Sequence, residues 1–581
     1  MRNLKKKWLQ INKKRILGRY VSCLPFLKVM LEILISWILY LPVAYILGAA
    51  VFSLTQKVYG VRILRTDSRI LAGLVIMTVY AQFFSLIGRV GLWANVWLFV
   101  LTLLSAIVLR KSIFADLREC RRERSIAEKC LLPLLVVLWA YMTSRGYAHY
   151  DTGLYHAQAI RWMEEVGIAP GLGLLHYRFS YNSSVFALFA LTSGSYLGIP
   201  SLHMANGMFA IVLSMRCLDL LRAVPNKQKT HRRKLLVSDY AIIAAAYYMT
   251  LILEEVVSPA SDYSAMMTVF FIAIAYLQAI EKKENTSIYC FICILGVYAM
   301  TLKLSSALVL ILVIHPIVCL IRDREWKKMA LSLGLGFLVA LPWMIRSVYI
   351  SGYLIYPVSG LDFFDVPWKL KPEDIAVDVA QISTWGRALY NSALVNMPIT
   401  QWFGNWFSTT LSRTEQLLIL ADMGSVVIVV GVCIVSLIRR KREMYPLLLA
   451  LVTFAVNFVY WLYSAPLMRY GYAHVLLLCC VLGGWICTHI RKDLMIRILV
   501  VLFLLYRLVA IGRYIGNSWF RESYLWQEDY EKFENEQYEV GGIPFYKAAS
   551  GDRTGYLFFP SAPSEFTGKL RGTSLSEGFT R

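Results

Sequence analysis

One acidic residue in the sequence lies between two histidines, directly after an apolar stretch, where it could take part in chemistry. The segment is HYDTGLYHAQAIRW, which places Asp151 between His149 and His156. We take this carboxylate as a candidate functional residue and the two histidines as candidate substrate-binding residues. The alternative is that Asp151 only caps a helix, a role that Asp fills well.

If a helix starts after Asp151, its face can be derived from the spacing. Residues at i, i+4, i+7 and i+11 lie on one side of an α-helix. These residues are Asp151, Tyr155, Gln158 and Trp162. The pattern predicts one functional face, with the carboxylate at its head and Tyr155 available to bind substrate.

A second acidic cluster, EEVVSPASDY, lies between two apolar stretches and contains Glu254, Glu255 and Asp262. Carboxylates at the membrane end of apolar helices are costly unless they are paired, hydrated or bound to metal. Together with Asp151 they could ligate a divalent cation such as Mg²⁺ or Mn²⁺, which takes oxygen ligands. The alternative is a solvated turn in which Asp262 caps the next helix.

Three cations follow at the ends of apolar stretches: Lys303, Arg346 and Arg469. An anionic ligand such as a lipid phosphate would explain them, because Arg offers a bidentate fork and Lys a point charge. The alternative is that these side chains extend to the lipid head groups.

The elements that must position these residues are membrane spans. The chain of 581 residues is 58% hydrophobic and 17% charged, which predicts an all-α polytopic membrane protein. Despite the net charge of +23, a nucleic-acid binder is excluded, because Lys and Arg cluster at the ends of apolar runs. About fourteen spans are expected. They are 29–54, 70–88, 92–110, 131–144, 201–222, 235–256, 263–280, 287–302, 304–321, 329–347, 424–438, 445–463, 470–489 and 493–512.

The basic loops between these spans predict the topology. The positive-inside rule assigns the loops to the cytoplasm. They are 110–129, 222–234, 282–283, 322–328, 439–442 and 491–492. Parity then requires that the apolar run 183–199 does not cross the membrane but forms an interfacial or re-entrant helix. The polar segments 145–200, 348–420 and 513–581 are expected outside, together with the N-terminus, although its basic residues favour the inside.

These features in this order resemble the GT-C superfamily of polytopic glycosyltransferases, and in particular a bacterial group within it. The group has motifs similar to HYDTGLYHAQAIRW, GLGLLHYRFSYNSS, SGYLIYP, DVPWK, SAPLMRYG and RGTSLSEGF. The resemblance covers residues 131–581. It implies a GT-C-like module at 131–512, with interfacial helices in its first external loop, and an extracytoplasmic tail or lid at 513–581. Residues 1–130, with three accessory spans, lie outside it.

The resemblance also implies a function. An inverting transferase of the bacterial cytoplasmic membrane would use a sugar carried on a polyprenyl phosphate, with its active site on the extracytoplasmic face. Asp151 would match the first-loop acid that deprotonates the acceptor or helps to bind metal, and Asp262 the second acidic site. Lys303 and Arg346 would lie near the leaving phosphate. The chain lacks a WWD-type peptide-binding motif, which favours a glycan or lipid acceptor.

Two other functions share many of these features. A polysaccharide polymerase or ligase would use Arg and His in a late external loop. A transporter or flippase of lipid-linked glycans would carry charges near mid-membrane and show symmetric halves with broken helices. The distance between Asp151 and Asp262 in the folded protein discriminates between these functions. A short distance favours a transferase, and a long distance favours either alternative.

Overall fold

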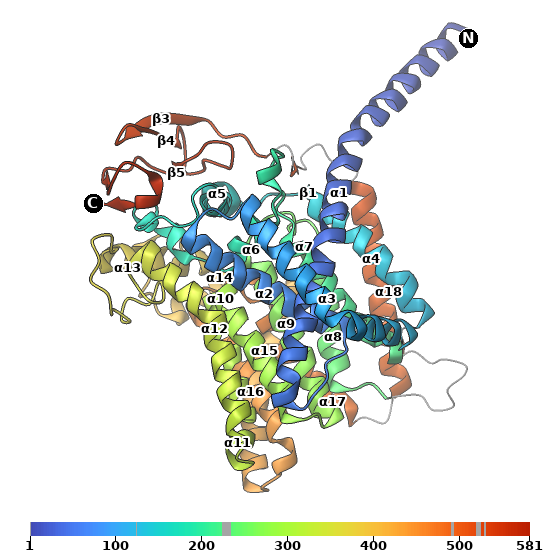
Figure 1. The fold of residues 1–581 in the computed structure, drawn as a ribbon. Coiled ribbons are helices and arrows are strands. Elements are labelled where there is room, and N and C mark those ends of the chain that lie inside the picture. The colour runs from blue at the N-terminus through green and yellow to red at the C-terminus, as the bar shows by residue number, and fades with distance from the viewer. Residues whose placement is uncertain (1, 124, 224–233, 490–492, 519–524, 528–529) are drawn as a thin grey trace.

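The protein is a bundle of helices with a small β-rich unit at one end (Figure 1). The computed structural model describes residues 2–123, 125–223, 234–489, 493–518, 525–527 and 530–581. Eleven helices in these ranges are long and apolar enough to cross a membrane. The expectation of an all-α polytopic membrane protein is confirmed at this level.

The α-helices run nearly the whole length of the chain. Their bounds are α1 Arg2–Tyr59, α2 Thr66–Ile87, α3 Leu92–Glu123, α4 Ile126–Ser144, α5 Ala157–Glu165, α6 Val185–Thr192, α7 Ala205–Cys217, α8 Val237–Leu251, α9 Ser261–Lys282, α10 Thr286–Leu302, α11 Ile314–Arg322, α12 Trp326–Ser351, α13 Pro372–Gly386, α14 Ile399–Thr409, α15 Arg413–Ile438, α16 Tyr445–Ser464, α17 Met468–Thr488 and α18 Asp493–Ser518. A π-helical turn, η1 (Thr152–His156), precedes α5, and a 3-10 segment, η6 (Leu304–Val313), precedes α11.

By helix length and composition, eleven of the fourteen expected spans are supported within the described residues, and the other three stay a prediction. All fourteen stretches contain helix, but α7, α8 and α10 have only 13, 15 and 17 residues. A span needs about 20 residues. The run 183–199 forms α6, a buried helix of 8 residues, which is too short to cross a bilayer. Sequence hydropathy did not separate these short buried helices from spans, because a buried helix is apolar all round.

The first two helices pack with almost no space between their backbones. A Cβ on Gly48 would lie 1.9 Å from the carbonyl oxygen of Arg69, and one on Gly73 would lie 1.7 Å from that of Ala44. Small residues allow membrane helices to approach this closely. Helix α1 also contacts α3, α4 and α12, so residues 28–123 pack against the rest of the bundle.

The C-terminal unit, residues 525–527 and 530–581, contains two small sheets and shares a third with β1 (Arg145–Gly146). β2 (Leu525–Trp526) pairs antiparallel with β1, directly after α4. β3 (Asn535–Val540) pairs antiparallel with β4 (Ile543–Ala548), which runs parallel to β5 (Ser561–Ala562). β6 (Lys569–Leu570) pairs antiparallel with β7 (Phe579–Thr580). The predicted tail is therefore folded, and Figure 1 shows its strands β3 to β5 near α5.

The two ends of the bundle carry different elements. The C-terminal unit and α13 lie at one end, and α11 with the turn that follows it lies at the other (Figure 1). That opposite end carries exposed cations in the turns 322–324 and 439–442, and the C-terminal unit carries others, such as Lys569 and Arg571. The basic residues of 224–233 and 490–492 were also assigned to the cytoplasmic loops, and they lie outside the described residues. The assignment of the basic loops to the cytoplasm therefore stays a prediction.

Candidate functional site

A cavity of about 310 Å³ lies at the end of the bundle that carries the C-terminal unit. Its walls come from η1, α9, η6, α13, α16 and α17, and from the segments before them. Five charged side chains line it: Asp151, Arg178, Asp262, Lys303 and Arg469. The cavity therefore collects four of the charged residues singled out in the sequence, from four segments of the chain, and Tyr155 lines it as well.

Arg469 links the two acidic clusters. Its Nη2 lies 2.8 Å from Oδ2 of Asp151, and its Nε lies 3.5 Å from Oδ2 of Asp262. The position at the start of α17 makes this possible, because the guanidinium projects from the first turn into the space between η1 and α9. The two carboxylates are thus close together at the membrane end of the bundle.

Asp151 occupies the N-cap position of η1, but its carboxylate makes no capping hydrogen bond. The carboxylate is instead paired with Arg469, so helix capping does not explain this residue. π-helical turns are rare in proteins, and many of those that occur lie at functional sites. Here the π-turn also changes the predicted face: Asp151 and Tyr155 line the cavity, whereas Gln158 Nε2 donates to the carbonyl oxygens of Gly555 and Phe558.

Trp162, the last residue of the predicted face, also packs away from the cavity. Its ring contacts the rings of Phe559 and Phe579 edge-on, at centroid distances of 4.9 and 5.8 Å. The amphipathic helix α5 thus holds the C-terminal unit rather than a ligand. The spacing did indicate a contact surface. Two of its four residues, Gln158 and Trp162, contact the C-terminal unit rather than the cavity.

The surroundings keep Asp151 ionised and both neighbouring histidines neutral. Burial alone would raise the pKa of Asp151, but the charge of Arg469 holds it well below its usual range. Burial and then Arg469 lower the pKa of His149 to about 4, and burial lowers that of His156 to about 3. The guanidinium of Arg469 contacts Nδ1 of His149 directly, so the neutral imidazole accepts this hydrogen bond. His156 is buried outside the cavity lining, with its Nδ1 unpartnered.

Asp262 and Lys303 form a direct ion pair in the wall of the cavity. Asp262 lies in the first turn of α9, where a carboxylate is favoured by the helix dipole, and the N-cap residue is Ala260. Lys303 ends α10, and its ammonium lies 3.6 Å from the ring centroid of Tyr470. The 3-10 segment η6 starts directly after Lys303, and so long a run of this helix type is uncommon.

A third acidic residue was missed in the sequence. Asp378 on α13 is buried, and it accepts hydrogen bonds from the hydroxyls of Tyr181 and Tyr356 at 2.6 and 2.9 Å. Burial raises its pKa. Arg178 extends from this network into the cavity: its Nε lies 3.9 Å from Asp378 and its Nη1 3.6 Å from Asp151.

Arg178 was not singled out because it lies in 3-10 structure that has no regular apolar pattern. Asp378, in contrast, could have been recognised from the sequence. It interrupts the apolar face that Ile375, Val379 and Ile382 form on the short helix α13. His474 on α17 also lines the cavity, and nothing in its sequence context distinguishes it from a core residue.

Arg346 lies elsewhere. It is buried in α12 and does not line the cavity. Its guanidinium donates to Oδ1 of Asn182 at 3.2 Å, to Oγ of Ser85, and to the carbonyl oxygen of Gly167 at 3.3 Å. These contacts join α2, α12 and the segment between α4 and α6. Arg346 therefore does not share the cavity with Lys303 and Arg469, because its guanidinium is bound by these three acceptors. Its predicted contact with a donor phosphate stays a prediction.

The expected metal ligands do not come together as a set. Glu255 accepts a hydrogen bond from the hydroxyl of Tyr263 at 2.7 Å, and neither Glu254 nor Glu255 lines the cavity. Within the described ranges, no three His, Cys, Asp or Glu side chains form a group that could hold a metal ion. Asp151 and Asp262 have cationic partners, so a divalent cation at these carboxylates stays a prediction.

The chain was also compared with known proteins. A family model described as a domain of unknown function (DUF8201) matches residues 30–476. No curated protein and no solved structure matches the chain. The matched region begins in α1, includes all five charged residues of the cavity, and ends before α18 and the C-terminal unit. Because the match covers more than half of the sequence, the protein belongs to the DUF8201 family.

Proposed function

We propose that the protein is an inverting glycosyltransferase that moves a sugar from a polyprenyl-phosphate-linked donor to a glycan or lipid acceptor. The reaction takes place at the outer face of the bacterial cytoplasmic membrane. One observation carries the proposal: Arg469 joins Asp151 and Asp262 in a single cavity that also holds Lys303 and Arg178. A base and several cations are thus available within one small volume.

In the proposed step, the acceptor hydroxyl oxygen forms a bond to the anomeric carbon on the face opposite the lipid phosphate. The bond between that carbon and the phosphate oxygen breaks, and the phosphate leaves with the electron pair. The proton of the hydroxyl passes to the carboxylate of Asp151. A base must approach that proton at about 2.6–3.2 Å between heavy atoms. Asp151 lines the cavity and is ionised, as this role requires.

The cations of the cavity suit the leaving phosphate. Fixed positive charges lower the barrier where negative charge develops, provided that they are already in place. Lys303 and Arg469 are held by Asp262, and Arg178 by Asp151 and Asp378. We assign to Arg178 and Arg469 the place that the sequence suggested for Arg346.

Donor binding would also activate the base. In the structure, the positive charge of Arg469 keeps the pKa of Asp151 low, which makes the carboxylate a weak base. A phosphate that pairs with Arg469 neutralises part of this charge, so the pKa of Asp151 rises towards its ordinary range. The base thus becomes effective only when the donor is bound.

The apolar part of the cavity suits a lipid. Phe186, Trp343 and Trp461 line it together with the charged groups. A prenyl chain could extend from the phosphate along these side chains towards the bilayer. The charged groups would then bind the phosphate and sugar, and the aromatic rings the first isoprene units.

The test uses the full-length protein in nanodiscs and a synthetic polyprenyl-phosphate-linked sugar. Release of polyprenyl phosphate reports turnover, and binding of the donor is measured separately. Asp151→Asn should lower turnover at least a hundredfold and leave donor binding nearly unchanged. Lys303→Ala and Arg469→Ala should weaken donor binding at least tenfold. Asp365→Asn, at an exposed carboxylate of an external loop, is the matched control and should behave like the wild type.

Two results would contradict the proposal. Equal donor binding in the wild type, Lys303→Ala and Arg469→Ala would remove the phosphate site. Turnover of Asp151→Asn within tenfold of the wild type would remove the base. Movement of an intact lipid-linked glycan across liposomes, without cleavage of the sugar–phosphate bond, would favour the flippase alternative.

A further inference from the structure

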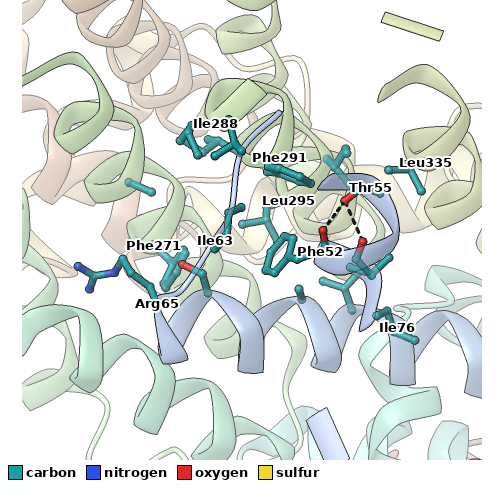
Figure 2. A pocket seen from close by; sticks show the side chains of 18 of the residues that line it. Phe52, Thr55, Ile63, Arg65, Ile76, Phe271, Ile288, Phe291, Leu295 and Leu335 are labelled. Atoms are coloured by element: carbon teal, nitrogen blue, oxygen red, sulfur yellow. Dashed lines mark hydrogen bonds between the residues drawn. The ribbon is translucent and has the colours of Figure 1, made fainter. Parts of the chain in front are cut away.

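A second cavity lies near the opposite end of the bundle, enclosed by α1, α2, α9, α10 and α12 (Figure 2). Its volume is about 570 Å³. Helix α9 relates the two cavities: Asp262 in its first turn lines one, and Lys282 in its last turn lines the other. At about 1.5 Å per residue these positions lie roughly 30 Å apart, which is the thickness of the hydrocarbon core. The second cavity is therefore separate from the proposed active site.

The walls of the second cavity are suited to hydrocarbon. Figure 2 shows Phe52, Phe291, Leu295 and other apolar side chains around it. The polar group of Thr55 is satisfied within its own helix, because its hydroxyl donates to the carbonyl oxygen of Val51 at 2.8 Å. An apolar space of this kind does not hold water well.

The cavity is also elongated. Its lining extends along α2 from Ser68 to Phe83. This stretch covers about 22 Å of helix. One leaflet of the hydrocarbon core is about 15 Å deep, half of the roughly 30 Å of a bilayer. An acyl chain parallel to α2 therefore fits along this length.

The polar residues of the lining gather at one end and present positive charge. Arg65 pairs with Asp67 and, at 2.9 Å, with Asp219, while Arg62 pairs with Asp116. The side chains of Asp67 and Asp116 are only 3% and 1% exposed, whereas those of Arg65 and Arg62 are 30% and 46% exposed. The carboxylates of Asp67 and Asp116 thus lie behind the guanidinium groups. Of the exposed residues beside them, Lys282 adds a cation and Glu284 an anion, so the three accessible cations of the mouth outnumber its one exposed carboxylate.

We propose that this cavity binds one anionic phospholipid of the surrounding bilayer. One acyl chain fills the apolar space between α2, α9 and α10, and the phosphate lies against Arg62, Arg65 and Lys282. A phospholipid is favoured because the mouth lies at the end of the bundle with the basic turns. Cationic surfaces of membrane proteins attract anionic lipids. The bound lipid holds α1, α2 and α10 together where they would otherwise enclose an empty space.

The experiment measures the thermal stability of the delipidated full-length protein in detergent, titrated with phosphatidylglycerol or with phosphatidylcholine. A ligand that binds only the folded state raises the melting temperature in a concentration-dependent way. Phosphatidylglycerol should raise it by several degrees, at concentrations at least tenfold lower than phosphatidylcholine requires.

Two variants test the two halves of the site. Ala275→Phe places a ring in the apolar space, and Lys282→Glu reverses an exposed charge at the mouth. Both should shift the midpoint of the phosphatidylglycerol titration at least tenfold. Lys283→Glu, at the neighbouring exposed position outside the lining, and Val427→Phe, on the outer face of α15, are the matched controls. Both controls should keep the wild-type midpoint.

A wild-type midpoint of the phosphatidylglycerol titration in Lys282→Glu would overturn the proposal. Because Lys282 is exposed, this variant provides a test even if Ala275→Phe fails to fold. A polyprenyl phosphate that binds more tightly than phosphatidylglycerol, and loses this affinity in Ala275→Phe, would also overturn it. That result would assign the cavity to the lipid of the proposed donor instead.

Discussion

Asp151 and Asp262 lie in different segments of the chain and bind the same guanidinium group, that of Arg469. With Lys303 and Arg178, the cavity holds two carboxylates and three cations, and the excess charge is positive. A bound anion can therefore pair with one of these cations while each carboxylate keeps a cationic partner. Each carboxylate also depends on the other through the shared partner, which makes their contributions to stability interdependent.

This coupling can be measured by a double-mutant cycle. Arg469→Met removes the shared partner and leaves two buried carboxylates close together, so it should destabilise the protein by about 3–5 kcal/mol. Asp151→Asn in the Arg469→Met background should recover part of this loss, because one of the repelling charges is gone. Thermal unfolding in detergent gives the comparison, with an expected non-additivity of about 1–3 kcal/mol. Strictly additive effects of the two substitutions would show that Asp151 and Arg469 do not interact.

Arg346 should behave as a structural residue. Arg346→Met leaves its three acceptors, on Asn182, Ser85 and Gly167, without their donor. We expect a loss of about 2–4 kcal/mol in stability, because hydrogen bonds to charged groups are among the stronger ones. The apparent donor affinity of the folded fraction should stay at the wild-type value. A tenfold weaker affinity without loss of stability would return Arg346 to the phosphate site.

The contact between η1 and the C-terminal unit should be sensitive to a single methyl group. A Cβ on Gly153 would lie 2.9 Å from Cζ of Phe533, and the carbonyl oxygen of Gly153 accepts hydrogen bonds from the amides of Thr554 and Gly555. Gly153→Ala should cost roughly 1–3 kcal/mol through this overlap. It should also speed proteolysis within residues 530–581.

A second substitution tests the cause. Phe533→Ala creates space opposite the new methyl group, so the double variant should be more stable than Gly153→Ala alone. If the double variant is as unstable as the sum of the single variants, the overlap with Phe533 is not the source of the effect.

Stability should fall in acid because of the buried histidine in η1. Burial lowers the pKa of His156 to about 3, so between about 6.5 and 3 the unfolded chain binds a proton that the folded protein does not. Stability is therefore lost as the pH falls below about 6.5, by about 2 kcal/mol at pH 5. His156→Phe keeps the contacts with Tyr155 and Phe186 and removes this contribution. Melting temperatures at pH 7 and pH 5 should differ less in this variant than in the wild type or in His489→Phe, at an exposed position.

The two ends of the bundle should label from opposite sides of the membrane. Single cysteines at Ser359 and Ser550, both exposed near the C-terminal unit or α13, should react with an impermeant maleimide on intact cells. A cysteine at Glu284, exposed beside the second cavity, should react only after permeabilisation. The variants are made in a chain without its native cysteines. The reverse pattern would place the basic end outside.

Four of the five charged residues of the cavity were visible in the sequence because they interrupt long apolar segments. Asp151, Asp262, Lys303 and Arg469 each begin or end such a segment, where a charge is costly and therefore noticeable. The sequence did not predict which way a side chain points near the end of a helix. This is why Arg346 was grouped with Arg469, although one packs inside the bundle and the other faces the cavity.

Helix length and irregular structure were less predictable. The apolar stretches that contain α7, α8 and α10 are long enough in the sequence to suggest spans, and the structure shows that the α-helices within them have only 13, 15 and 17 residues. Arg178 and Tyr181 lie in a 3-10 turn, which has neither the helical nor the strand period on which pattern analysis depends. The π-turn after Asp151 likewise has no sequence period, so the predicted face could not extend correctly beyond Tyr155.

The pairing of β2 with β1 has a consequence for biosynthesis. Strand β1 leads directly into His149 and Asp151, whereas β2 follows α18, the last helix of the bundle. Strand β1 is therefore synthesised long before the strand with which it pairs. The ion pairs of Asp262 with Lys303 and of Asp151 with Arg469 join residues that all precede α18, so they do not depend on β2. The closure of this end of the molecule by β2, in contrast, has to wait until α18 has been made.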